Sequence, residues 1–432
     1  MSSERWKPSS ERRKPSSERW KRAPFGFGRR EFLRRGAVAG LGLSLLPLAP
    51  DSPAEEPGPA GESGPRVRRR VRLGRTGLEV PDIGFGSSRL SGDEDLVRYA
   101  LDRGITYFDT AGSYMQGGAE ETIGRALAGR RDDVVLGSKV ITQAGDPPAV
   151  LMAALEGSLR RLRTDYVDVY FNHAVNDPAR LDDSWQEFAS RAREQGKIRF
   201  TGVSGHGGRL VECLELALER DMADVILAAH NFGQDERFWE QYTRRMDFVA
   251  RQPGLPAVLA KAAEKKVGVV AMKTLMGSRL NDLRPFETSG SSFAQAAFRW
   301  TLSQPHTDAL VVTMRSREQI DEFLGASGWT RPTRADLGLL TAYLERNSQA
   351  QCRHGCSACE AACPASVPVS EVLRTRMYAE DYGDPAHGRE EYALLGAGAQ
   401  ACLSCSQRTC AGACPYGLPV DELTRRTHGL LG

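Results

Sequence analysis

The chain has little net charge of either sign outside its first 35 residues. The full sequence of 432 residues carries a formal charge of +3 at pH 7. The first 35 residues hold 12 Lys and Arg side chains against 4 Glu, a local charge of +8, which leaves −5 for the remainder. A mildly acidic body lacks the basic surface that nucleic-acid binding requires, so we expect no nucleic-acid partner.

The amino-terminal part also lacks an apolar run long enough to cross a bilayer. Residues 1–28 are mostly a polar, proline-punctuated repeat of seven residues, which predicts a disordered basic segment. The apolar stretch that follows runs only from Ala37 to Ala49, whereas a spanning helix needs about 20 residues.

Arg29 and Arg30 precede this stretch, and a linker rich in Pro, Gly and Glu follows it as far as Pro65. Paired arginines before a short apolar segment resemble a twin-arginine export signal, here over residues 29–65. A basic stretch before a buried helix is the alternative. The resemblance implies passage through the twin-arginine translocation machinery, to the periplasm or to a membrane-anchored position that faces outside.

Cysteine is nearly absent before residue 352. Cys213 stands alone there, on an apolar helical face, which predicts a buried core side chain. The other eight cysteines fall in the last quarter of the chain. A disulfide framework usually spreads through a small secreted domain, so this clustering indicates metal binding.

The sequence lacks a Gly-x-Gly-x-x-Gly turn after its first predicted strand, which argues against a doubly wound dinucleotide-binding sheet. Between residues 66 and 330, short β-branched runs alternate with amphipathic helical patterns such as 149–162 and 210–219. This rhythm predicts an α/β fold, a (β/α)8 barrel. The predicted strands are Ile83–Gly86, Ile105–Asp109, Val134–Ser138, Val167–Phe171, Ile198–Val203, Val225–Ala229, Gly268–Met272 and Ala309–Thr313.

Four segments of this region resemble conserved motifs of the aldo/keto reductase family. They are residues 73–80, 104–124, 158–168 and 196–204. The resemblance implies an oxidoreductase acting on an aldehyde, ketone or alcohol with a nicotinamide cofactor. It extends to the subgroup that has a twin-arginine signal and a C-terminal ferredoxin-type domain with two [4Fe–4S] clusters.

The catalytic tetrad of that family maps onto Asp109, Tyr114, Lys139 and His173, each at or just beyond the end of a predicted strand. The carboxyl ends of barrel strands are where active sites form. Reduction of a carbonyl needs a proton for the developing alkoxide. A lysine held by a carboxylate would bring the pKa of the tyrosine, ordinarily near 10, toward neutrality. The histidine would donate a hydrogen bond to the carbonyl oxygen.

The same resemblance implies cofactor contacts, for NAD or NADP without distinction. They are Ser204, Lys273, Leu275, Gly277, Arg315 and Arg317. The chain departs from the family at other positions where cofactor contacts are usual. It has Gly205 in place of Asn, Leu227 in place of Gln, Met272 in place of an aromatic residue and Phe323 in place of Asn. His206 and His230 are interpreted equally as pocket or core residues.

The eight late cysteines form two runs, each closed by Cys-Pro, with spacings close to those of bacterial ferredoxins. In that pattern the fourth cysteine of each run binds the other run's cluster. The first set is then Cys352, Cys356, Cys359 and Cys414, and the second is Cys363, Cys402, Cys405 and Cys410. Structural zinc is the main alternative, followed by disulfides.

The segment between the two cysteine runs is compatible with helix, with an amphipathic pattern over residues 369–378. We therefore expect a connecting helix in 331–350 and an α-helical iron–sulfur domain in 351–432. The predicted function is reduction or oxidation of a small carbonyl or alcohol substrate, with the clusters relaying electrons to a redox partner protein. The alternative is a non-catalytic barrel that serves as an electron-transfer or structural module.

Overall fold

The computed structural model describes residues 64–233, 252, 254–275, 287, 291–347, 352, 356–380 and 385–432, without the side chains of 344–347, 397 and 398. The chain divides into two units, residues 1–62 and 63–432, and the fold described below is that of the second. The predicted basic repeat lies outside the described residues. So does the predicted export signal with its linker, except for residues 64 and 65.

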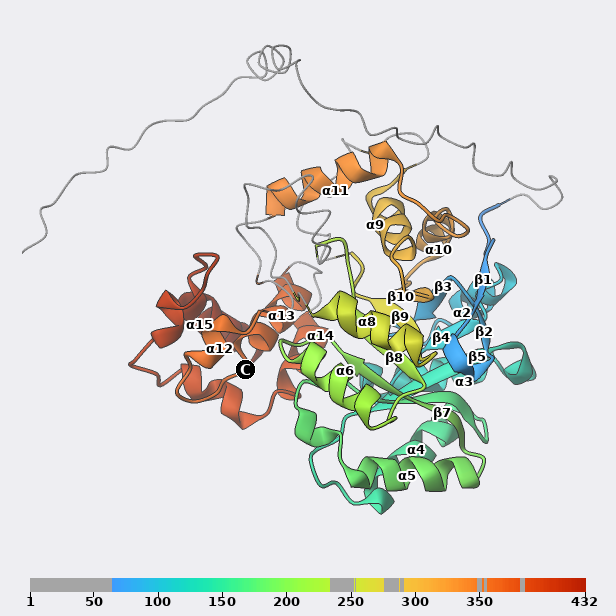
Figure 1. Cartoon of the computed structure of the whole chain (residues 1–432), viewed down its shortest axis with the longest axis horizontal. Helices are drawn as coiled ribbons and strands as arrows, with labels where there is room; N and C mark the ends of the chain where they lie inside the picture. The colour runs from blue at the N-terminus through green and yellow to red at the C-terminus, as the bar shows by residue number, and fades with distance from the viewer. Residues whose placement is uncertain are drawn as a thin grey trace, which may run out of the picture. The chain divides into compact units, whose positions relative to one another are not determined.

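Eight parallel strands close into a barrel in the order β10-β3-β4-β5-β6-β7-β8-β9 (Figure 1). Their bounds are β3 Ile83–Gly86, β4 Tyr107–Asp109, β5 Val135–Val140, β6 Val167–Asn172, β7 Ile198–Gly205, β8 Val225–Ala229, β9 Gly268–Met272 and β10 Ala309–Thr313. The predicted (β/α)8 barrel is confirmed. Bounds predicted for β3, β8, β9 and β10 match to the residue, because in each case a buried β-branched or small-residue run ends abruptly at a polar or turn residue.

Helices follow the strands and cover the barrel. They are α2 Glu94–Asp102, α3 Gly118–Ala126, α4 Pro148–Leu162, α5 Asp183–Glu194, α6 Leu210–Glu219, α8 Leu255–Glu264, α9 Phe293–Leu302 and α10 Arg317–Leu324. Four of them begin at a side chain that accepts a backbone N–H of the first turn, namely Asp93, Asp182, Ser292 and Ser316. Cys213 on α6 is fully buried, as predicted.

A short antiparallel hairpin closes the amino end of the barrel. Its strands are β1 (Arg70–Arg72) and β2 (Glu79–Pro81). Leu73, Leu78 and Val80 of the hairpin pack in one buried cluster with side chains from the barrel interior. The active site therefore has to lie at the opposite, carboxyl end of the strands, as in other barrels of this type.

Helix α11 (Arg334–Asn347) packs on α9. Its Leu339, Leu340 and Tyr343 share a buried cluster with Phe293 and other side chains of the barrel. Below them, buried Arg299 of α9 and buried Asp336 of α11 form an ion pair of 3.0 Å. Apolar burial and a desolvated ion pair together hold this connecting helix on the barrel.

The described residues after 356 include four α-helices, gathered in one group in Figure 1. They are α12 Ala358–Ala361, α13 Val369–Glu380, α14 Pro385–Ala393 and α15 Val420–Leu431. Helix α13 packs against both α14 and α15. Apolar side chains such as Val372, Leu373 and Leu431 form a small separate core there, and Cys359 belongs to it.

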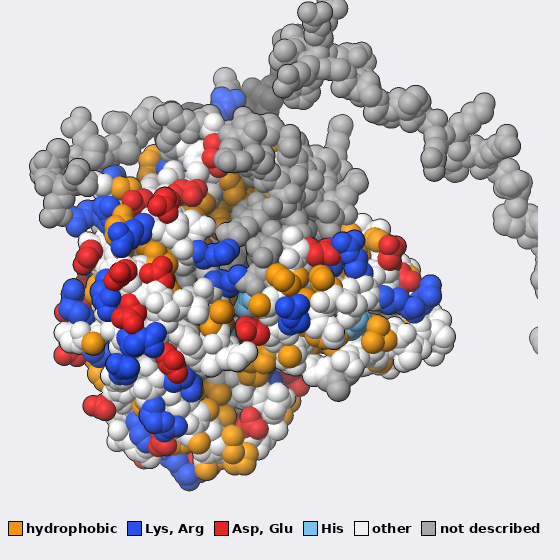
Figure 2. All heavy atoms as spheres, turned by 180° about the vertical axis from the view of Figure 1, so that it is seen from behind, with side chains coloured by type: hydrophobic (Ala, Val, Ile, Leu, Met, Phe, Trp, Pro, Cys, Tyr) orange, Lys and Arg blue, Asp and Glu red, His pale blue; other side chains and the backbone are white. Residues whose placement is uncertain are grey.

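The described surface carries charges of both signs. On the face shown in Figure 2, Lys and Arg side chains alternate with Asp and Glu side chains over the barrel. No helix among the described residues is long and apolar enough to cross a membrane.

Candidate active site

Four polar side chains meet at the carboxyl ends of neighbouring strands. Asp109 is the last residue of β4, Lys139 lies near the end of β5, and His173 directly follows β6. Tyr114 lies five residues after Asp109, at the start of a short 3-10 turn. Because β4, β5 and β6 pair in parallel register, their ends bring these side chains to one mouth of the barrel.

Lys139 and Asp109 form the buried centre of the group. The Lys139 ammonium donates to Asp109 Oδ1 and to the backbone oxygen of Thr110, each at 2.6 Å. The two side chains are 1% and 5% exposed. A carboxylate this deeply buried needs a cationic partner, and this pairing fixes where the ammonium lies.

Tyr114 and His173 lie against that pair. The Lys139 nitrogen is 5.0 Å from the centre of the Tyr114 ring. The rings of Tyr114 and His173 meet edge to face, with centroids 5.6 Å apart. Phenol, ammonium, carboxylate and imidazole thus converge in one place, as the tetrad prediction requires.

The backbone after Tyr114 is in an uncommon conformation. Met115 and Gln116 both have φ in the left-handed region, at 50° and 55°. Non-glycine residues pay a conformational cost there, and such strain concentrates at functional sites. Gly117 follows at φ 92°, and an added Cβ there would lie 2.7 Å from the Arg161 side chain. The backbone conformation of the turn that carries Tyr114 is therefore closely defined.

Burial controls the ionisation of the four groups. It raises the pKa of Tyr114 well above its ordinary value of 10.0, and the negative charge of Asp109 adds to this. It lowers the pKa of His173 well below its ordinary value of 6.5, and Lys139 lowers it further. Burial also raises the pKa of Asp109 and lowers that of Lys139, while the attraction between the two opposes both shifts.

The expected lowering of the Tyr114 pKa by Lys139 is therefore wrong for this structure. Desolvation is the largest influence on this pKa, and the charge of Asp109 raises it further, whereas Arg374 lowers it. At neutral pH the phenol is protonated and the imidazole is neutral. Both can donate a hydrogen bond, and Tyr114 can donate a proton.

The C-terminal helices contribute a second group of polar side chains to this mouth. Lys273, one residue beyond β9, donates to the hydroxyl of Tyr378 on α13 at 3.0 Å. Arg374 of α13 donates to the same hydroxyl at 3.1 Å. His206, one residue beyond β7, lies 3.5 Å from Glu371. His206 is thus a pocket residue, whereas His230 is buried in the barrel wall beside Trp300.

Sequence reasoning missed Glu371, Arg374 and Tyr378. The amphipathic pattern over residues 369–378 indicated a helix, and α13 is that helix. Three polar side chains at intervals of three and four residues mark one side of it. Nothing in the sequence indicated that this side faces the tetrad.

The predicted cofactor contacts are spread around the same end of the barrel. Ser204, near the end of β7, is buried, and its Oγ accepts from the Ala174 N–H at 3.0 Å. Leu275 is partly buried against the barrel core, and Gly277 lies outside the described residues. Arg315 and Arg317 are exposed at the amino end of α10. Neither arginine pairs with a carboxylate among the described side chains, so both can receive a phosphate.

The departures from the family pattern have structural reasons. Leu227 is 1% exposed and fills the barrel interior, and Met272 packs against the same cluster. At Gly205, an added Cβ would lie 2.7 Å from Leu210 and 2.9 Å from the backbone oxygen of Val175. An asparagine therefore does not fit there without movement. Phe323 is a core residue, packed edge to face on Phe298.

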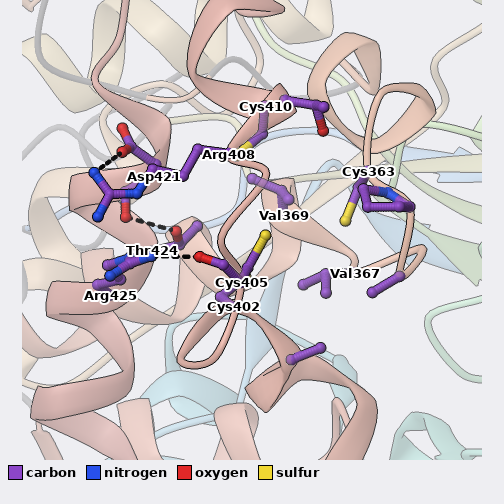
Figure 3. Close-up of a pocket in the computed structure, with 14 residues that line it drawn as sticks. Cys363, Val367, Val369, Cys402, Cys405, Arg408, Cys410, Asp421, Thr424 and Arg425 are labelled. Atoms are coloured by element: carbon purple, nitrogen blue, oxygen red, sulfur yellow. Dashed lines mark hydrogen bonds and ion pairs between the residues drawn. The ribbon is translucent and has the colours of Figure 1, made fainter.

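Four of the late cysteines line one cavity that is open in part to solvent (Figure 3). They are Cys363, Cys402, Cys405 and Cys410. The sulfur atoms of Cys363 and Cys405 point into the space between their two segments. Cys363 comes from the first run and the other three from the second, which is the crossed set that the ferredoxin pattern implies.

The remaining four cysteines are also neighbours. Cys352 is close enough to Cys359, Cys356 and Cys414 for their charges to act on it, and burial raises its pKa. Within the described residues, no group of three or more His, Cys, Asp or Glu side chains is arranged to hold a single metal ion. A four-iron cluster differs in this respect, because each thiolate binds a different iron and the sulfur atoms stand further apart.

Comparison with known proteins identifies the barrel. Residues 82–334 match the model of the aldo/keto reductase family. The chain belongs to this family. It is 29% identical over 297 residues to the oxidoreductase YrpG of Bacillus subtilis, covering 59% of this chain and 89% of the relative. It is 24% identical over 294 residues to an L-glyceraldehyde 3-phosphate reductase of Escherichia coli, covering 58% and 84%.

Among solved structures, an aldo/keto reductase from Klebsiella pneumoniae in complex with NADPH is similar to this chain. The identity is 27% and the TM-score 0.49, with 65% of this chain and 95% of that one covered. The family match makes the chain an oxidoreductase. The matched residues contain all four tetrad positions and end before the cysteine-rich helices.

Proposed function

We propose that this aldo/keto reductase interconverts a small aldehyde or ketone with its alcohol at Asp109, Tyr114, Lys139 and His173, using NADPH or NADH. The observation that carries the proposal is the buried Lys139–Asp109 pair beside Tyr114 and His173. A bound nicotinamide nucleotide supplies the hydride. The protein has to bind the carbonyl compound, orient it and supply the proton.

Each residue of the tetrad has a separate part in that task. The rings of His173 and Tyr114 lie edge to face, so a carbonyl oxygen that reaches both would receive two hydrogen bonds. Tyr114 then transfers its proton to that oxygen as negative charge develops there. Lys139 stabilises the phenolate that remains, and Asp109 holds the ammonium in place. Lys139 thus stabilises Tyr114 after the proton has left. This role does not require a lowered pKa of the phenol before the reaction.

The residues around the mouth fit a nicotinamide nucleotide. Two exposed arginines, Arg315 and Arg317, stand at the amino end of a helix, which suits an adenosine phosphate. Ser204 lies beside the loop that carries His173, and Leu275 offers an apolar wall. We include Lys273 and Gly277 in the same proposal on the family pattern alone. The relative solved with NADPH is in keeping with this choice of cofactor.

For the late cysteines we propose two [4Fe–4S] clusters. One would be held by Cys352, Cys356, Cys359 and Cys414, and the other by Cys363, Cys402, Cys405 and Cys410. Four cysteines around one cavity are a suitable donor set for a four-iron cluster. The clusters would relay single electrons to a redox partner protein, whereas nicotinamide exchanges electrons in pairs. Export through the twin-arginine machinery, to the periplasm or a membrane-anchored position facing outside, belongs to the same proposal.

A second candidate function is a barrel that no longer catalyses and supports the C-terminal helices. Two observations favour it. Leu227 is buried in the barrel interior, and Gly205 leaves no room for a side chain, so two usual contacts of the nicotinamide amide are missing. The complete tetrad favours the catalytic proposal instead.

Turnover of a panel of aldehydes by Tyr114→Phe distinguishes the two. Loss of the acid/base phenol is expected to lower kcat by roughly 100- to 10,000-fold. Tyr166→Phe is the matched control, because Tyr166 directly precedes β6, where its ring lies against the Arg131 guanidinium and its hydroxyl donates to Asp132. Equal activity of Tyr114→Phe and wild type would contradict Tyr114 as the proton donor, and no activity in any protein with saturating NADPH would leave the non-catalytic alternative.

A further inference from the structure

A fully buried carboxylate outside the tetrad has no part in the proposed mechanism. It belongs to Glu120, the third residue of α3. One of its oxygens accepts from the Ser138 hydroxyl at 2.5 Å, and the other accepts from Arg161 of α4 at 2.7 Å. A carboxylate that has lost its hydration needs such partners. Glu120 therefore joins α3, α4 and β5 through one side chain.

On the β5 side, this group reaches the tetrad at Lys139. Ser138 directly precedes Lys139 on the strand, so the two side chains point to opposite faces of it. Burial lowers the pKa of Lys139, and the charges of Asp109 and Glu120 oppose that shift. Glu120 thus lies within electrostatic range of the ammonium, on the helix-covered side of β5.

On the α4 side, Arg161 packs against both ends of the turn that carries Tyr114. A Cβ added to Gly117 would lie 2.7 Å from its Cδ and 2.9 Å from its Nε. A Cβ added to Gly112 would lie 3.1 Å from its Nη2. The N–H of Gly112 also donates to the backbone oxygen of Lys139 at 3.3 Å. One guanidinium therefore lies against the backbone before and after Tyr114.

The turn needs support from its surroundings. Met115 and Gln116 both have φ in the left-handed region, which costs conformational free energy in residues other than glycine. Backbone of this kind persists only where neighbouring groups hold it in place. Arg161 packs against this turn from a neighbouring helix.

The position of Arg161 is itself closely defined. It donates to the Ser158 hydroxyl, one turn earlier on α4, at 3.4 Å. Helices α3 and α4 pack on each other. Their backbones approach so closely that a Cβ added to Gly124 would lie 2.6 Å from the backbone oxygen of Arg161. The guanidinium is thus held by two helices and by the carboxylate between them.

We propose that Arg161 and Glu120 are positioning residues, which hold the turn of Tyr114 against the strand of Lys139 so that phenol and ammonium stay aligned for proton transfer. This inference rests on the proposed function. The proton still comes from Tyr114. An arginine suits this role because its planar fork can pair with a carboxylate and lie flat against backbone at the same time. A displacement of about 1 Å at a reacting group can cost roughly 100-fold in rate.

Kinetics of Arg161→Ala test the proposal in full-length protein prepared anaerobically, with NADPH and the aldehyde that wild type reduces fastest. We expect kcat to fall by roughly 10- to 100-fold, because the proton donor is no longer aligned. KM for the aldehyde and Kd for NADPH should stay within about threefold of wild type. Arg161→Lys keeps a cation beside Glu120 and serves if Arg161→Ala does not fold. Its kcat should still fall by about 10-fold, since an ammonium lacks the planar fork. A kcat within threefold of wild type in Arg161→Lys overturns the proposal.

A double-mutant cycle shows whether Arg161 acts through Tyr114. If it does, adding Arg161→Ala to Tyr114→Phe should change the residual kcat by less than about threefold, because no phenol remains to be aligned. A purely structural role would give the same fold-loss in both backgrounds, and that result overturns the proposal.

Arg131→Ala is the matched control. Arg131 pairs at 2.8 Å with Asp168, whose carboxylate is almost as buried as that of Glu120. Asp168 is the second residue of β6 and therefore lies at the amino end of the barrel, away from the tetrad. Arg131→Ala should lower the free energy of unfolding but leave kcat within about threefold of wild type. Equal losses of kcat in Arg131→Ala and Arg161→Ala would overturn the proposal.

Hydrogen exchange tests the support of the turn without any turnover. Backbone amides of residues 112–117 should exchange roughly 10-fold faster or more in Arg161→Ala than in wild type, and those of β6 at the wild-type rate. Unchanged exchange in the turn overturns this proposal whatever the activity. Loss of turnover in Tyr114→Phe together with full kcat in Arg161→Ala overturns it as well, while the proposed function stands.

Discussion

The barrel buries apolar side chains both inside its strands and between strands and helices, whereas the helices after residue 356 share one small core. Five cysteines, Cys352, Cys363, Cys402, Cys410 and Cys414, pack against that core as partly buried members. Leu394, Leu403 and Leu430 are between 38% and 56% exposed in this region, and Val150 is the corresponding exposed residue of the barrel. The barrel can thus rely on its own packing, whereas the C-terminal helices bury little, and the proposed clusters would supply stability that this small core lacks.

The largest expected effect is the loss of the C-terminal fold when ligands of a proposed cluster are removed. In Cys402→Ser/Cys410→Ser, backbone amides of α13 and α15 should exchange hydrogen roughly 100-fold faster or more, because metal binding and folding are coupled. Amides of α4 and α5 should exchange at the wild-type rate. Hydrogen-exchange mass spectrometry measures both regions in one sample.

The matched control for this pair is Cys213→Ala, which removes the buried cysteine of the barrel. It should change exchange around α6 alone. Equal acceleration in both regions after Cys402→Ser/Cys410→Ser would mean that barrel and C-terminal helices unfold as one unit.

A smaller effect is expected at the ion pair that holds α11 on the barrel. Asp336 accepts hydrogen bonds from Arg299 at 3.0 Å and from the N–H and hydroxyl of Thr333 at 2.7 and 2.8 Å. Asp336→Asn removes the carboxylate charge that is paired with the buried guanidinium and should lower the free energy of unfolding by about 3–5 kcal/mol in urea titrations. Asp95→Asn, which breaks an exposed pair with Arg98, should cost less than about 1 kcal/mol. Similar costs for both variants would contradict this account.

The smallest expected effect is in the dependence of aldehyde reduction on pH. Burial keeps the pKa of Tyr114 well above 10.0 and that of His173 well below 6.5. Reduction needs the protonated phenol, so kcat should stay level from neutral pH to about 9 and fall only beyond the ordinary tyrosine range. A fall with an apparent pKa near 8 would show instead that Lys139 lowers the pKa of the phenol.

The barrel was predictable because its signals are local. Runs such as Val225–Ala229 and Ala309–Thr313 each begin directly after an aspartate and consist almost entirely of apolar residues, and strand ends therefore followed from the sequence. The tetrad was predictable in the same way, since strand ends of a barrel share one rim. The ionisation of Tyr114 was not, because it depends on the three-dimensional balance between burial and the Asp109 charge.

The polar side of α13 was not predictable either. Its helix was expected from an amphipathic pattern, but which side packs inside the C-terminal domain depends on contacts between segments far apart in sequence. Tyr378 and Lys273 are 105 residues apart, and neither has a neighbour in sequence that indicates the other. Only the fold brings them together.

The contact between Lys273 and Tyr378 has a consequence for biosynthesis. Once the chain has been translated as far as residue 330, the barrel and all four tetrad residues are present. The mouth of the barrel still lacks the side chains of α13. A prematurely terminated polypeptide would therefore lack the Tyr378 side chain that Lys273 contacts. This contact would form only after translation of the last hundred residues had finished and those residues had docked.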